Sequence, residues 1–413
     1  GQPRKRVGAV STVTGKAAEL SLDPTGTLGN FAVSAGKVLA SASGNLIQFP
    51  RNNLAALDTA TGALTDWNPD CNGTVYSLAV SSNAVFVGGS FSRIGGLERI
   101  NLAAVDPQNG QVLSWNPQTG GGMNALAIAG DTLYVGGFAA VDVHTGKAMP
   151  WNPKANGEVR SLQVVNNVIY AAGVFTLIGG KARNYLAALD PVTGLATDWD
   201  PNPNGPVISV LSSKGTLYAG GAFNRIGGRA RANLAALSME TGQATLWSAE
   251  PNGSVLALAA AHDTVFAAGQ FAFIGGQTRT NLAGLDMRIQ SNNSTRWNPA
   301  VSSLLSESIS GSSIRSVLAT ENTLYVGGNV RFGPELRPYL AAFDFPPRLQ
   351  AVRPQGVRPF QVDVHGASGR VYVLETSTNL QAWLPVRTNS GPFSLREGGV
   401  TNSGGYYRAK TLE

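Results

Sequence analysis

The sequence predicts an all-β protein, with a seven-bladed β-propeller of four-stranded blades over residues 1–345 and a small C-terminal β-sandwich over residues 346–413. Three markers in one register predict the propeller: a tryptophan, an apolar five-residue segment, and a hydrophobic run closed by a small pair such as Gly88-Gly89. The tryptophans, spaced by 48, 36, 48, 48 and 50 residues, are Trp67, Trp115, Trp151, Trp199, Trp247 and Trp297. A fixed period of this length is typical of stacked repeats such as propellers.

The composition excludes several classes of protein. Glycine (50 residues) and proline (22) are too frequent for a helical chain, and a charged fraction of 14% beside a hydrophobic fraction of 43% excludes a disordered polyelectrolyte. No apolar run approaches the ~18 residues of a membrane helix, so we expect no membrane span. The net charge of +6 is spread as single arginines along the repeats and at the chain ends, so we expect no nucleic-acid groove.

The few cysteines and histidines exclude other kinds of site. With one cysteine, Cys71, a single chain has neither a disulfide framework nor a Cys-based metal cluster. The three histidines lie far apart in the sequence, and we therefore expect no metal and no cofactor. The chain begins at Gly1 without an apolar signal core, and we expect a processed product or a fragment.

Each repeat contains the elements of a four-stranded antiparallel sheet. In the second repeat the expected strands are, in order, Val75 to Val80, Val85 to Val87, Leu102 to Asp106 and Val112 to Trp115. Chain reversals are predicted at Asn-Gly pairs such as Asn72-Gly73, which tolerate positive φ. A sheet of this size cannot bury both its faces alone, so we expect the repeats to stack around an axis. The tryptophan would lie between neighbouring blades, where it covers the most apolar area.

The two ends of the repeat region predict how the ring closes. Val7 to Ser11 aligns with the apolar segment of later repeats, whereas the last repeat stops at Asp344 before any tryptophan strand. We therefore expect the N-terminal region, near Ala17 to Leu22, to supply the missing strand of the final blade, which leaves no free sheet edge. The apolar segment then occurs eight times for seven blades, and the sequence leaves open which copy is surplus.

The repeated residues resemble a known family. The matching stretches are Gly73-x-Val75-x-x-Leu78-Ala79-Val80, Val85-Phe86-Val87-Gly88-Gly89-Ser90-Phe91, Ile94-Gly95-Gly96, Arg99-x-Asn101-Leu102-Ala103 and Trp115-Asn116-Pro117. Over about residues 7–345 the chain resembles the delta-60 repeat β-propeller family of secreted bacterial proteins. The kelch repeat, which also ends a strand in Gly-Gly, is a weaker match. The resemblance implies a propeller in a secreted or surface setting, and it implies no shared reaction.

Residues 346–413 do not continue the period. They alternate like strands at Phe360 to His365, Tyr372 to Glu375, Ala382 to Val386 and Tyr406 to Lys410. This stretch resembles a small β-sandwich module at the C-terminus of secreted bacterial multidomain proteins. The matching residues are Gly366, Gly369, Tyr372, Glu375, Ser377, Thr378, Asn379, Leu380, Trp383, Tyr407 and Arg408. The resemblance implies an accessory module, which at this length is near the lower limit for independent stability.

One repeated loop position, three residues before the apolar segment, supplies the candidate binding residues. They are Arg51, Arg99, Arg183, Arg231, Arg279 and Arg337. A ring of guanidinium groups could collect carboxylates or sulfated sugars. The alternative, which we favour, is that each arginine bonds local carbonyls or the aspartate of its own blade, because a residue needed in every blade usually serves the blade.

The aspartates that end most apolar segments allow a similar choice of roles. They are Asp58, Asp106, Asp142, Asp190, Asp286 and Asp344. Each could fix a turn or pair with the arginine of its blade, and we favour both of these over catalysis.

Departures from the repeat are better candidates for binding, because the needs of a blade do not explain them. The third repeat lacks twelve residues where Gly136-Gly137 runs straight into Phe138, which predicts a notch on one face. Beyond the sixth repeat, Met287 to Arg296 replaces a Thr-Gly turn and Ser302 to Ser313 inserts a serine-rich loop. Loops on a rigid scaffold often carry binding residues. The alternative that we favour is a tolerated insertion without a role.

Together these features favour a non-catalytic module that is secreted, at the bacterial cell surface or in the periplasm. We expect it to bind an unidentified protein or glycan through the loops of one face, as an interaction or structural part of a larger surface assembly. The alternative is a carbohydrate-active hydrolase or lyase with two acids near the central channel. No Gly-x-Ser-x-Gly elbow marks a serine hydrolase.

One segment of the sequence bears on a quinone cofactor. The segment from Ala56 to Trp67 resembles the tryptophan-docking motif of quinoprotein dehydrogenase propellers, with one residue more between glycine and tryptophan. Calcium-binding acids and a vicinal cysteine pair, which those enzymes often use, are not recognisable in the sequence. We therefore expect no quinone.

Overall fold

A computed structural model describes most of the chain. The described residues are 7–11, 17–20, 28–46, 51–59, 63–117, 123–136, 139–299, 301–303, 313–332, 339–344, 348–352, 361–365, 371–377, 383–396 and 406–412. Over these ranges the chain forms strands, turns and bends and no helix, as an all-β protein should. The chain divides into two compact units, which are described separately. The propeller unit is Gly1–Gly8, Glu19–Leu318 and Tyr325–Ala341, and the C-terminal unit is Ala9–Ala18, Ala319–Leu324 and Ala342–Glu413.

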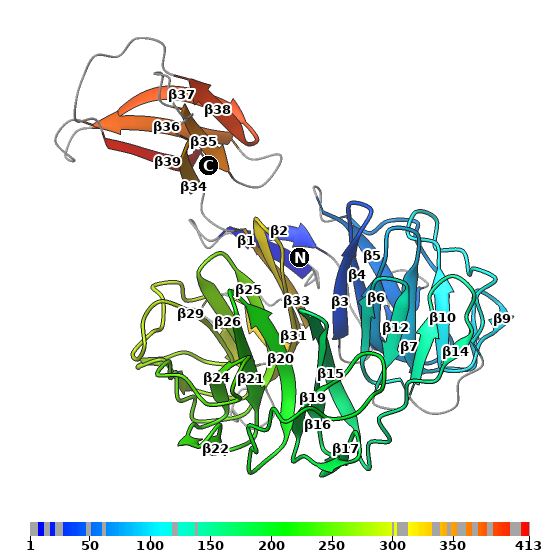
Figure 1. The fold of residues 1–413 in the computed structure, drawn as a ribbon. Coiled ribbons are helices and arrows are strands. Elements are labelled where there is room, and N and C mark those ends of the chain that lie inside the picture. Colours follow the sequence, from blue (N-terminus) through cyan, green and yellow to red (C-terminus); the bar gives the residue numbers. More distant parts are fainter. Residues whose placement is uncertain are drawn as a thin grey trace. The chain divides into compact units, whose positions relative to one another are not determined.

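Successive antiparallel sheets, one for each repeat, build the propeller unit (Figure 1). Repeats one, two and four to six each pair an inner, a middle and an outer strand. In that order the strands are β3 (Leu28–Ser34), β4 (Lys37–Leu46), β5 (Arg51–Asp58); β6 (Thr74–Val80), β7 (Val85–Ser90), β10 (Leu102–Val105); β15 (Val159–Val165), β16 (Val168–Gly173), β19 (Leu186–Leu189); β20 (Val207–Ser213), β21 (Thr216–Gly221), β24 (Leu234–Ser238); and β25 (Val255–Ala261), β26 (Thr264–Gly269), β29 (Leu282–Asp286).

The third repeat and the last sheet differ from this pattern. The third repeat is the four-stranded sheet β11 (Leu126–Ala129), β12 (Thr132–Val135), β13 (Ala139–Asp142) and β14 (Ala148–Met149). The last sheet has the order β2 (Ala17–Leu20), β1 (Val7–Ser11), β33 (Tyr339–Asp344), β32 (Thr323–Phe332) and β30 (Val301–Ser303), and β31 (Ser313–Ala319) also pairs with β32. The neighbour of β33 is therefore β1, and the segment expected beside it, near Ala17 to Leu22, lies one place further out. Ring closure and the number of blades stay predictions.

The fourth strand of a regular blade is shorter than the sequence predicts. It pairs with the outer strand through one bridge, as at Val105 with Val112 and at Leu189 with Ala196. Two backbone hydrogen bonds flank the second bridge, from the Asp190 amide to Leu195 O and from the Thr197 amide to Ala188 O, both 2.9 Å. The chain then turns towards the next repeat, where the indole N–H of Trp199 donates a hydrogen bond to Ser238 O. This change of direction ends the ladder after a single bridge.

Short two-stranded hairpins, which the sequence analysis did not predict, follow the middle strands of four repeats. They are β8 (Arg93–Ile94) with β9 (Leu97–Glu98), β17 (Leu177–Ile178) with β18 (Lys181–Ala182), β22 (Arg225–Ile226) with β23 (Arg229–Ala230), and β27 (Phe273–Ile274) with β28 (Gln277–Thr278). A Gly-Gly pair forms each turn, and at Gly95 and Gly96 φ is 57° and 75°. The Ile-Gly-Gly motif is therefore a hairpin turn, since glycine adopts positive φ without steric cost.

The tryptophans join consecutive repeats. The buried Trp199 belongs to one core cluster with Leu186 of its own repeat and Leu217 of the next. Its indole N–H donates to the carbonyl of Ser238, at the end of the next repeat's outer strand, at 3.0 Å. Tyr170 of its own middle strand meets the indole edge-to-face, with ring centroids 5.2 Å apart. An indole of this size buries about 200 Å², which stabilises the packing by on the order of 5 kcal/mol.

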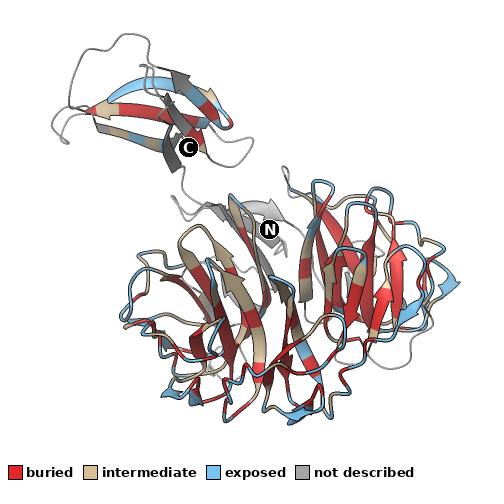
Figure 2. Cartoon of the chain, in the orientation of Figure 1, coloured by how far each residue is buried: buried red, intermediate tan, exposed pale blue. Residues whose placement is uncertain are grey.

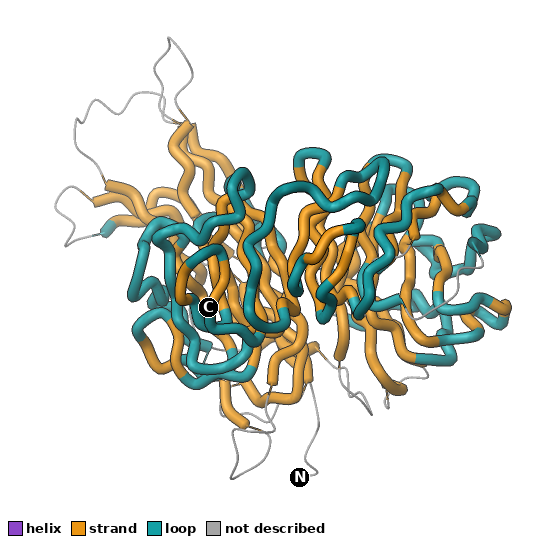
Figure 3. The backbone as a smooth tube through the Cα atoms, turned by 60° about the horizontal axis from the view of Figure 1, so that its bottom comes forward, coloured by secondary structure: helices purple, strands orange, loops and turns teal. Residues whose placement is uncertain are grey.

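The same contact recurs along the chain and confirms that the tryptophan lies between neighbouring blades. The further indole bonds are Trp67 to Asp106 O, Trp115 to Asp142 O, Trp151 to Asp190 O and Trp247 to Asp286 O, at 2.9 to 3.1 Å. Figure 2 shows the buried residues concentrated along the strands of successive sheets. In Figure 3 loops run over the ends of these strands.

The C-terminal unit contains two three-stranded sheets. Their orders are β34 (Arg348–Val352), β35 (Gln361–His365), β38 (Phe393–Arg396), and β37 (Leu384–Ser390), β36 (Val371–Ser377), β39 (Tyr406–Leu412). Val364 and Phe393 of the first sheet form one buried cluster with Tyr372 and Leu374 of the second. The buried carboxylate of Glu375 bonds Arg408 and Lys410 at 2.6 Å, and the guanidinium of Arg408 lies 4.2 Å above the Trp383 ring. Hydrogen bonds from Lys410 and Arg408 lower the pKa of Glu375.

One backbone position in each regular repeat needs a left-handed residue. Immediately before the apolar segment, φ is about +60°, and the residues there are Asn53, Asn101, Tyr185, Asn233 and Asn281. Asparagine tolerates this conformation better than most residues. The Asn233 side chain also donates from Nδ2 to Pro251 O at 3.1 Å.

We predict that Asn233→Ala lowers the free energy of unfolding of the propeller unit by about 2 kcal/mol, because it loses a hydrogen bond and forces alanine into the left-handed region. Asn233→Gly removes only the hydrogen bond and should cost about half as much. Urea unfolding of both variants measures the difference. Equal losses would contradict the role assigned to the backbone conformation.

Candidate functional site

The repeated arginines bond the backbone of their own blades. The Arg231 guanidinium donates to Ala230 O at 2.9 Å and to Thr245 O at 2.7 Å, so it bridges the outer strand region and the following segment. The same pair of carbonyl bonds is made by Arg99, Arg183 and Arg279. Arg51 donates to the equivalent carbonyl of Thr65 at 3.1 Å. Burial lowers the pKa of Arg231, and neighbouring Arg229 adds to this shift.

These contacts supply the structural role that the sequence favoured for the arginines. A guanidinium suits this bridge because its donors form a planar fork that reaches two acceptors at once. Binding of an anion by these residues is not tested by the contacts and stays a prediction. Arg337 lies outside the described residues.

Four of the repeated aspartates, Asp106, Asp142, Asp190 and Asp286, accept hydrogen bonds from the amides of their turns, and fixing a turn was one of the two roles expected. Oδ1 of Asp190 accepts from the Thr193 amide at 2.7 Å, from its hydroxyl at 2.8 Å and from the Val192 amide at 3.0 Å. These bonds, led by the Thr193 amide, lower the pKa of Asp190. Asp142 is held in the same way by Thr145 and His144, and its pKa is lowered too. The hydrogen bonds keep these carboxylates ionised in place at the surface.

Cys71 has no features of a reactive thiol. It is buried, and its Sγ donates to Gly73 O at 3.4 Å. Burial raises the pKa of the Cys71 thiol to about 11, whereas a nucleophilic cysteine needs a lowered pKa. In the ranges that the structure describes, no three His, Cys, Asp or Glu side chains gather at one point as metal ligands. The same ranges hold no helix long and apolar enough to cross a membrane.

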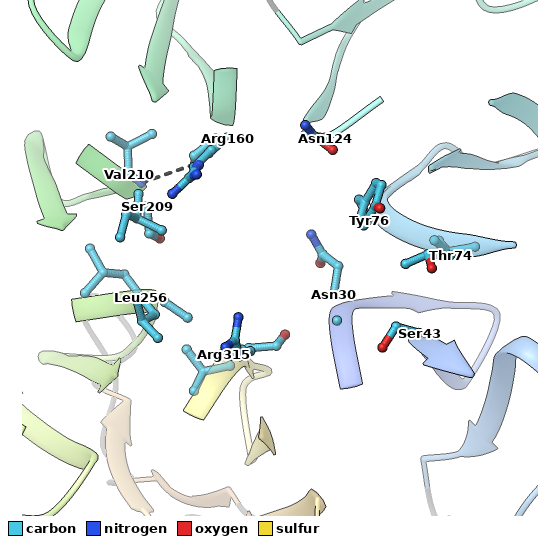
Figure 4. A pocket seen from close by; sticks show the side chains of 18 of the residues that line it. Asn30, Ser43, Thr74, Tyr76, Asn124, Arg160, Ser209, Val210, Leu256 and Arg315 are labelled. Atoms are coloured by element: carbon cyan, nitrogen blue, oxygen red, sulfur yellow. Dashed lines mark hydrogen bonds between the residues drawn. The ribbon is translucent and has the colours of Figure 1, made fainter. Parts of the chain in front are cut away.

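A pocket of about 520 Å³ lies among the inner strands of the propeller unit (Figure 4). The inner strands of five repeats and β31 each contribute a residue at or next to one register position, and the third repeat contributes a residue that precedes its inner strand β11. These residues are Asn30, Tyr76, Asn124, Arg160, Ile208, Leu256 and Arg315, and we call them the channel ring. Serines, threonine, glutamine and aliphatic side chains complete the walls, so the described lining is neutral or cationic.

β-Bulges direct five of the channel-ring side chains. The ladder with the middle strand shifts register between Val159 and Ser161, with Arg160 as the extra residue. Equivalent shifts occur around Asn30, Tyr76, Ile208 and Leu256. A bulge leaves one residue unpaired and re-aims its side chain. The bulge therefore turns this position away from the blade and into the pocket.

Arg315 occupies the same position in the last sheet. A Cβ built on Gly328 would touch Ser313 O and the Cα of Ile314, just as one on Gly173 would touch Glu158 O and the Cα of Val159. Ile314 is thus equivalent to Val159, and the next residue, Arg315, to Arg160.

A short polar network sets the charge on one side of the pocket. Arg160 Nε bonds Glu158 Oε2 at 2.7 Å, and Asn124 Nδ2 donates to Glu158 Oε1 at 2.8 Å. Both charged side chains of the pair are about 40% exposed. Hydrogen bonds between repeats join neighbouring inner strands. The Val210 amide donates to Ser161 Oγ at 3.2 Å, a bond drawn as a dashed line in Figure 4. The Leu126 amide donates to Ser77 Oγ at 3.0 Å.

The channel ring is not among the sites predicted from the sequence. Its position is an unspecified residue in the repeated pattern, the one after Val75, and a search for recurring residues passes over it. The signal that could have found it is the opposite of recurrence: a position in fixed register where amide, phenol, guanidinium and aliphatic side chains all occur.

The other expected binding segments are partly described. In the third repeat β12 ends at Val135 and β13 begins at Ala139, so the described residues there form no small hairpin of the kind seen after the other middle strands. A notch at this place stays a prediction. After β29, Arg288 bonds both carboxylate oxygens of Asp286, at 3.0 and 2.7 Å, and thereby replaces the Thr-Gly turn. Of the inserted serine-rich loop, Ser302 to Ser313, residues 304–312 lie outside the described residues.

A second pocket, of about 390 Å³, lies among loops of the fourth and fifth repeats. Its walls include Asn184, Asp200, Asn202 and Arg225. Asp200 lies 3.4 Å from Arg183, and Asn184 Nδ2 donates to Asn202 Oδ1 at 2.9 Å. Its polar groups therefore already bond one another, which leaves the channel ring as the stronger candidate site.

A family profile described as outer membrane protein assembly factor BamB matches residues 98–327, more than half of the chain. Among curated proteins, none matches the sequence. The delta-60 repeat family, a propeller family of the same general kind, stays a prediction.

Solved structures resemble the fold at low identity. The computationally designed Ika8 protein is 16% identical with a TM-score of 0.50, over 81% of this chain and 99% of that one. BamB from Moraxella catarrhalis is 13% identical with a TM-score of 0.42, over 82% and 90%. The extracellular domain of a hybrid two-component system from B. thetaiotaomicron is 12% identical with a TM-score of 0.46, over 94% and 54%. At this identity the first shows a shared fold alone, and the TM-scores of the other two are too low to carry a conclusion.

We predict that Arg231→Gln lowers the free energy of unfolding by about 1 to 3 kcal/mol, because glutamine cannot bridge the carbonyls of Ala230 and Thr245. The matched control is Arg229→Gln on the exposed strand β23, which should change it by less than about 0.5 kcal/mol. Urea unfolding followed by tryptophan fluorescence compares the two. If both variants lose the same stability, the carbonyl bridge does not hold the blade.

Proposed function

The chain belongs to the family of outer membrane protein assembly factor BamB, and from this premise we propose that it is a non-catalytic interaction module outside the cytoplasm, in the periplasm or at the cell surface. The family's description is that of an assembly factor, a protein that acts by binding others. A propeller suits this role, since its blades form a rigid scaffold and its loops are free to differ. The partner that we propose is a protein of the cell envelope or surface.

The proposal includes a finer architecture. The chain forms seven blades closed by the N-terminal strand, and residues 346–413 form a small β-sandwich of the kind seen in secreted bacterial proteins. The sheet order β1–β33–β32 supports the closure, and the two C-terminal sheets with a common apolar cluster support the sandwich. Membership of the delta-60 repeat group, with its secreted setting, belongs to the same proposal.

Exposed apolar side chains beside the shortened third repeat carry the proposal of a protein partner. Ile100, after the hairpin of the second repeat, is 51% exposed, and Leu177 in the hairpin of the fourth is 44% exposed. The third repeat lies between them in the chain and shares one core cluster with the second and another with the fourth. Its own outer strand β14 exposes Met149. Apolar side chains at the edge of a shortened blade offer a protein partner area to bury.

The chemistry of the central pocket favours binding over catalysis. Guanidinium, amide, hydroxyl, phenol and aliphatic groups line it, and none of these exchanges a proton readily near neutral pH. The carbohydrate-active alternative requires two acids near the channel, and the described lining does not favour it.

We predict that a photo-reactive phenylalanine derivative at Ile100 or Leu177 cross-links the full chain, in cells of its source organism, to one envelope or surface protein. Matched controls are Leu246 and Ile289, which are 59% and 49% exposed and follow the outer strands of the fifth and sixth repeats. Adducts should be several-fold more abundant from the first two positions. The same yield at all four positions, or no adduct at any, would overturn the proposal.

A further inference from the structure

We propose that the channel ring binds a hydroxylated organic acid, a small molecule with a carboxylate and several hydroxyl groups. Arg315 and Arg160 would hold the carboxylate, and Asn30, Tyr76 and Asn124 the hydroxyl groups. This site lies wholly within the propeller unit and goes beyond the proposed protein partner, because it assigns a small-molecule ligand to a different part of the fold.

The scaffold of successive repeats positions the channel-ring side chains. Six successive repeats and the last sheet each direct one residue into a common space, and Figure 4 shows the labelled members distributed around an open centre. Since inner strands of successive repeats are in contact, the order of the side chains around the pocket follows the order of the chain. A ring built in this way is fixed by the scaffold and needs no loop to order on binding, which reduces the entropic cost.

The channel-ring residues differ in type from one repeat to the next. Positions that a blade requires keep one residue type, as at Trp199 and Arg231, and their side chains bond the blade or its neighbour. Channel-ring side chains point away from their blades, so blade stability does not select them. Their variety is what a single ligand with different groups on its different sides requires.

The two positive charges of the ring lie on one side of it. In ring order Arg160 and Arg315 flank the aliphatic pair Ile208 and Leu256. Arg315 is exposed, and among the described residues no hydrogen bond or ion pair to it is formed. Arg160 shares its charge with Glu158 at 2.7 Å. The guanidinium of Arg315, which has no bonded partner among the described residues, is therefore the stronger anion site, and a planar carboxylate matches its fork of donors.

The opposite side of the ring carries polar side chains that suit hydroxyl groups. Asn30, Tyr76 and Asn124 follow one another there and offer amide and phenol groups, which both donate and accept hydrogen bonds. Hydroxyl groups of a ligand need such two-way partners, whereas a simple inorganic anion needs donors alone. The pocket volume of about 520 Å³ lies within the range of about 300 to 1,000 Å³ typical of small-molecule sites.

Isothermal titration calorimetry on the purified full chain tests the proposal, with D-glucuronate, D-galacturonate and citrate as probes. Hexanoate, glucose and sulfate are the comparison compounds, since each lacks the hydroxyl groups, the charge or the organic body. We expect a hydroxylated acid to bind and the three comparison compounds to bind at least tenfold more weakly. Absence of binding by every acid up to about 10 mM would overturn the proposal. Sulfate or glucose binding as tightly as the best acid would do so as well.

Variants of the ring separate this site from other arginines. Arg315→Gln should weaken binding of the best acid by about tenfold to a hundredfold, because it removes a charged donor. Glu158→Gln should tighten it several-fold, because Arg160 is then released from its ion pair. Arg229→Gln, on an exposed hairpin, should leave the affinity unchanged, and so should Arg231→Gln, although the latter lowers stability. Unchanged affinity in Arg315→Gln, weaker binding in Glu158→Gln, or loss of binding in Arg231→Gln would each overturn the assignment.

These outcomes are independent of the protein-partner proposal. Calorimetry reports the central pocket, and the cross-links report the outer edge beside the third repeat. Thermal unfolding of each variant, followed by circular dichroism, identifies any variant that loses binding because it does not fold. For such a variant at Arg315, Arg315→Lys keeps the charge and should retain more affinity than Arg315→Gln does.

Discussion

Each regular repeat depends on a hydrogen bond that it cannot complete alone. The indole N–H of Trp199 needs the carbonyl of Ser238, which belongs to the next repeat, and four further tryptophans make the same bond forward along the chain. A repeat in isolation would expose both the indole and the apolar surface around it. The repeats are therefore stable only as neighbours, which is why the sheets pack in succession and why their residues keep one register.

This dependence divides the residues of a repeat into two groups. Arg231 and Asp190 represent those that every repeat uses in the same way, to bridge carbonyls or to fix a turn. Arg160 and Arg315 represent those whose position recurs while their chemistry does not. The first group holds the scaffold, and the second group is free to take a ligand. The role of an arginine in this protein thus depends on whether the equivalent position in the other repeats is also arginine.

Much of the fold was predictable because recurrence reports the needs of a blade. The period placed Trp199 between repeats, and the bonds of Asp190 confirmed a turn. The small hairpin at Gly95-Gly96 and the single bridge at Ala196 were missed, since both are set by local backbone geometry. The channel ring was missed for a deeper reason. Its members are more than 30 residues apart in the chain and differ in type, so only the arrangement of strands in space brings them together.

Hydrogen exchange of the indole N–H protons, followed by ¹⁵N-edited NMR, tests most directly whether the forward bonds hold the repeats together. The account predicts that the protons of Trp67, Trp115, Trp151, Trp199 and Trp247 exchange only when the whole propeller unfolds, with protection of about 10⁴-fold or more. Trp383 in the C-terminal unit is an internal reference from outside the propeller. Exchange of the five indoles at the rate of a free indole would contradict the account.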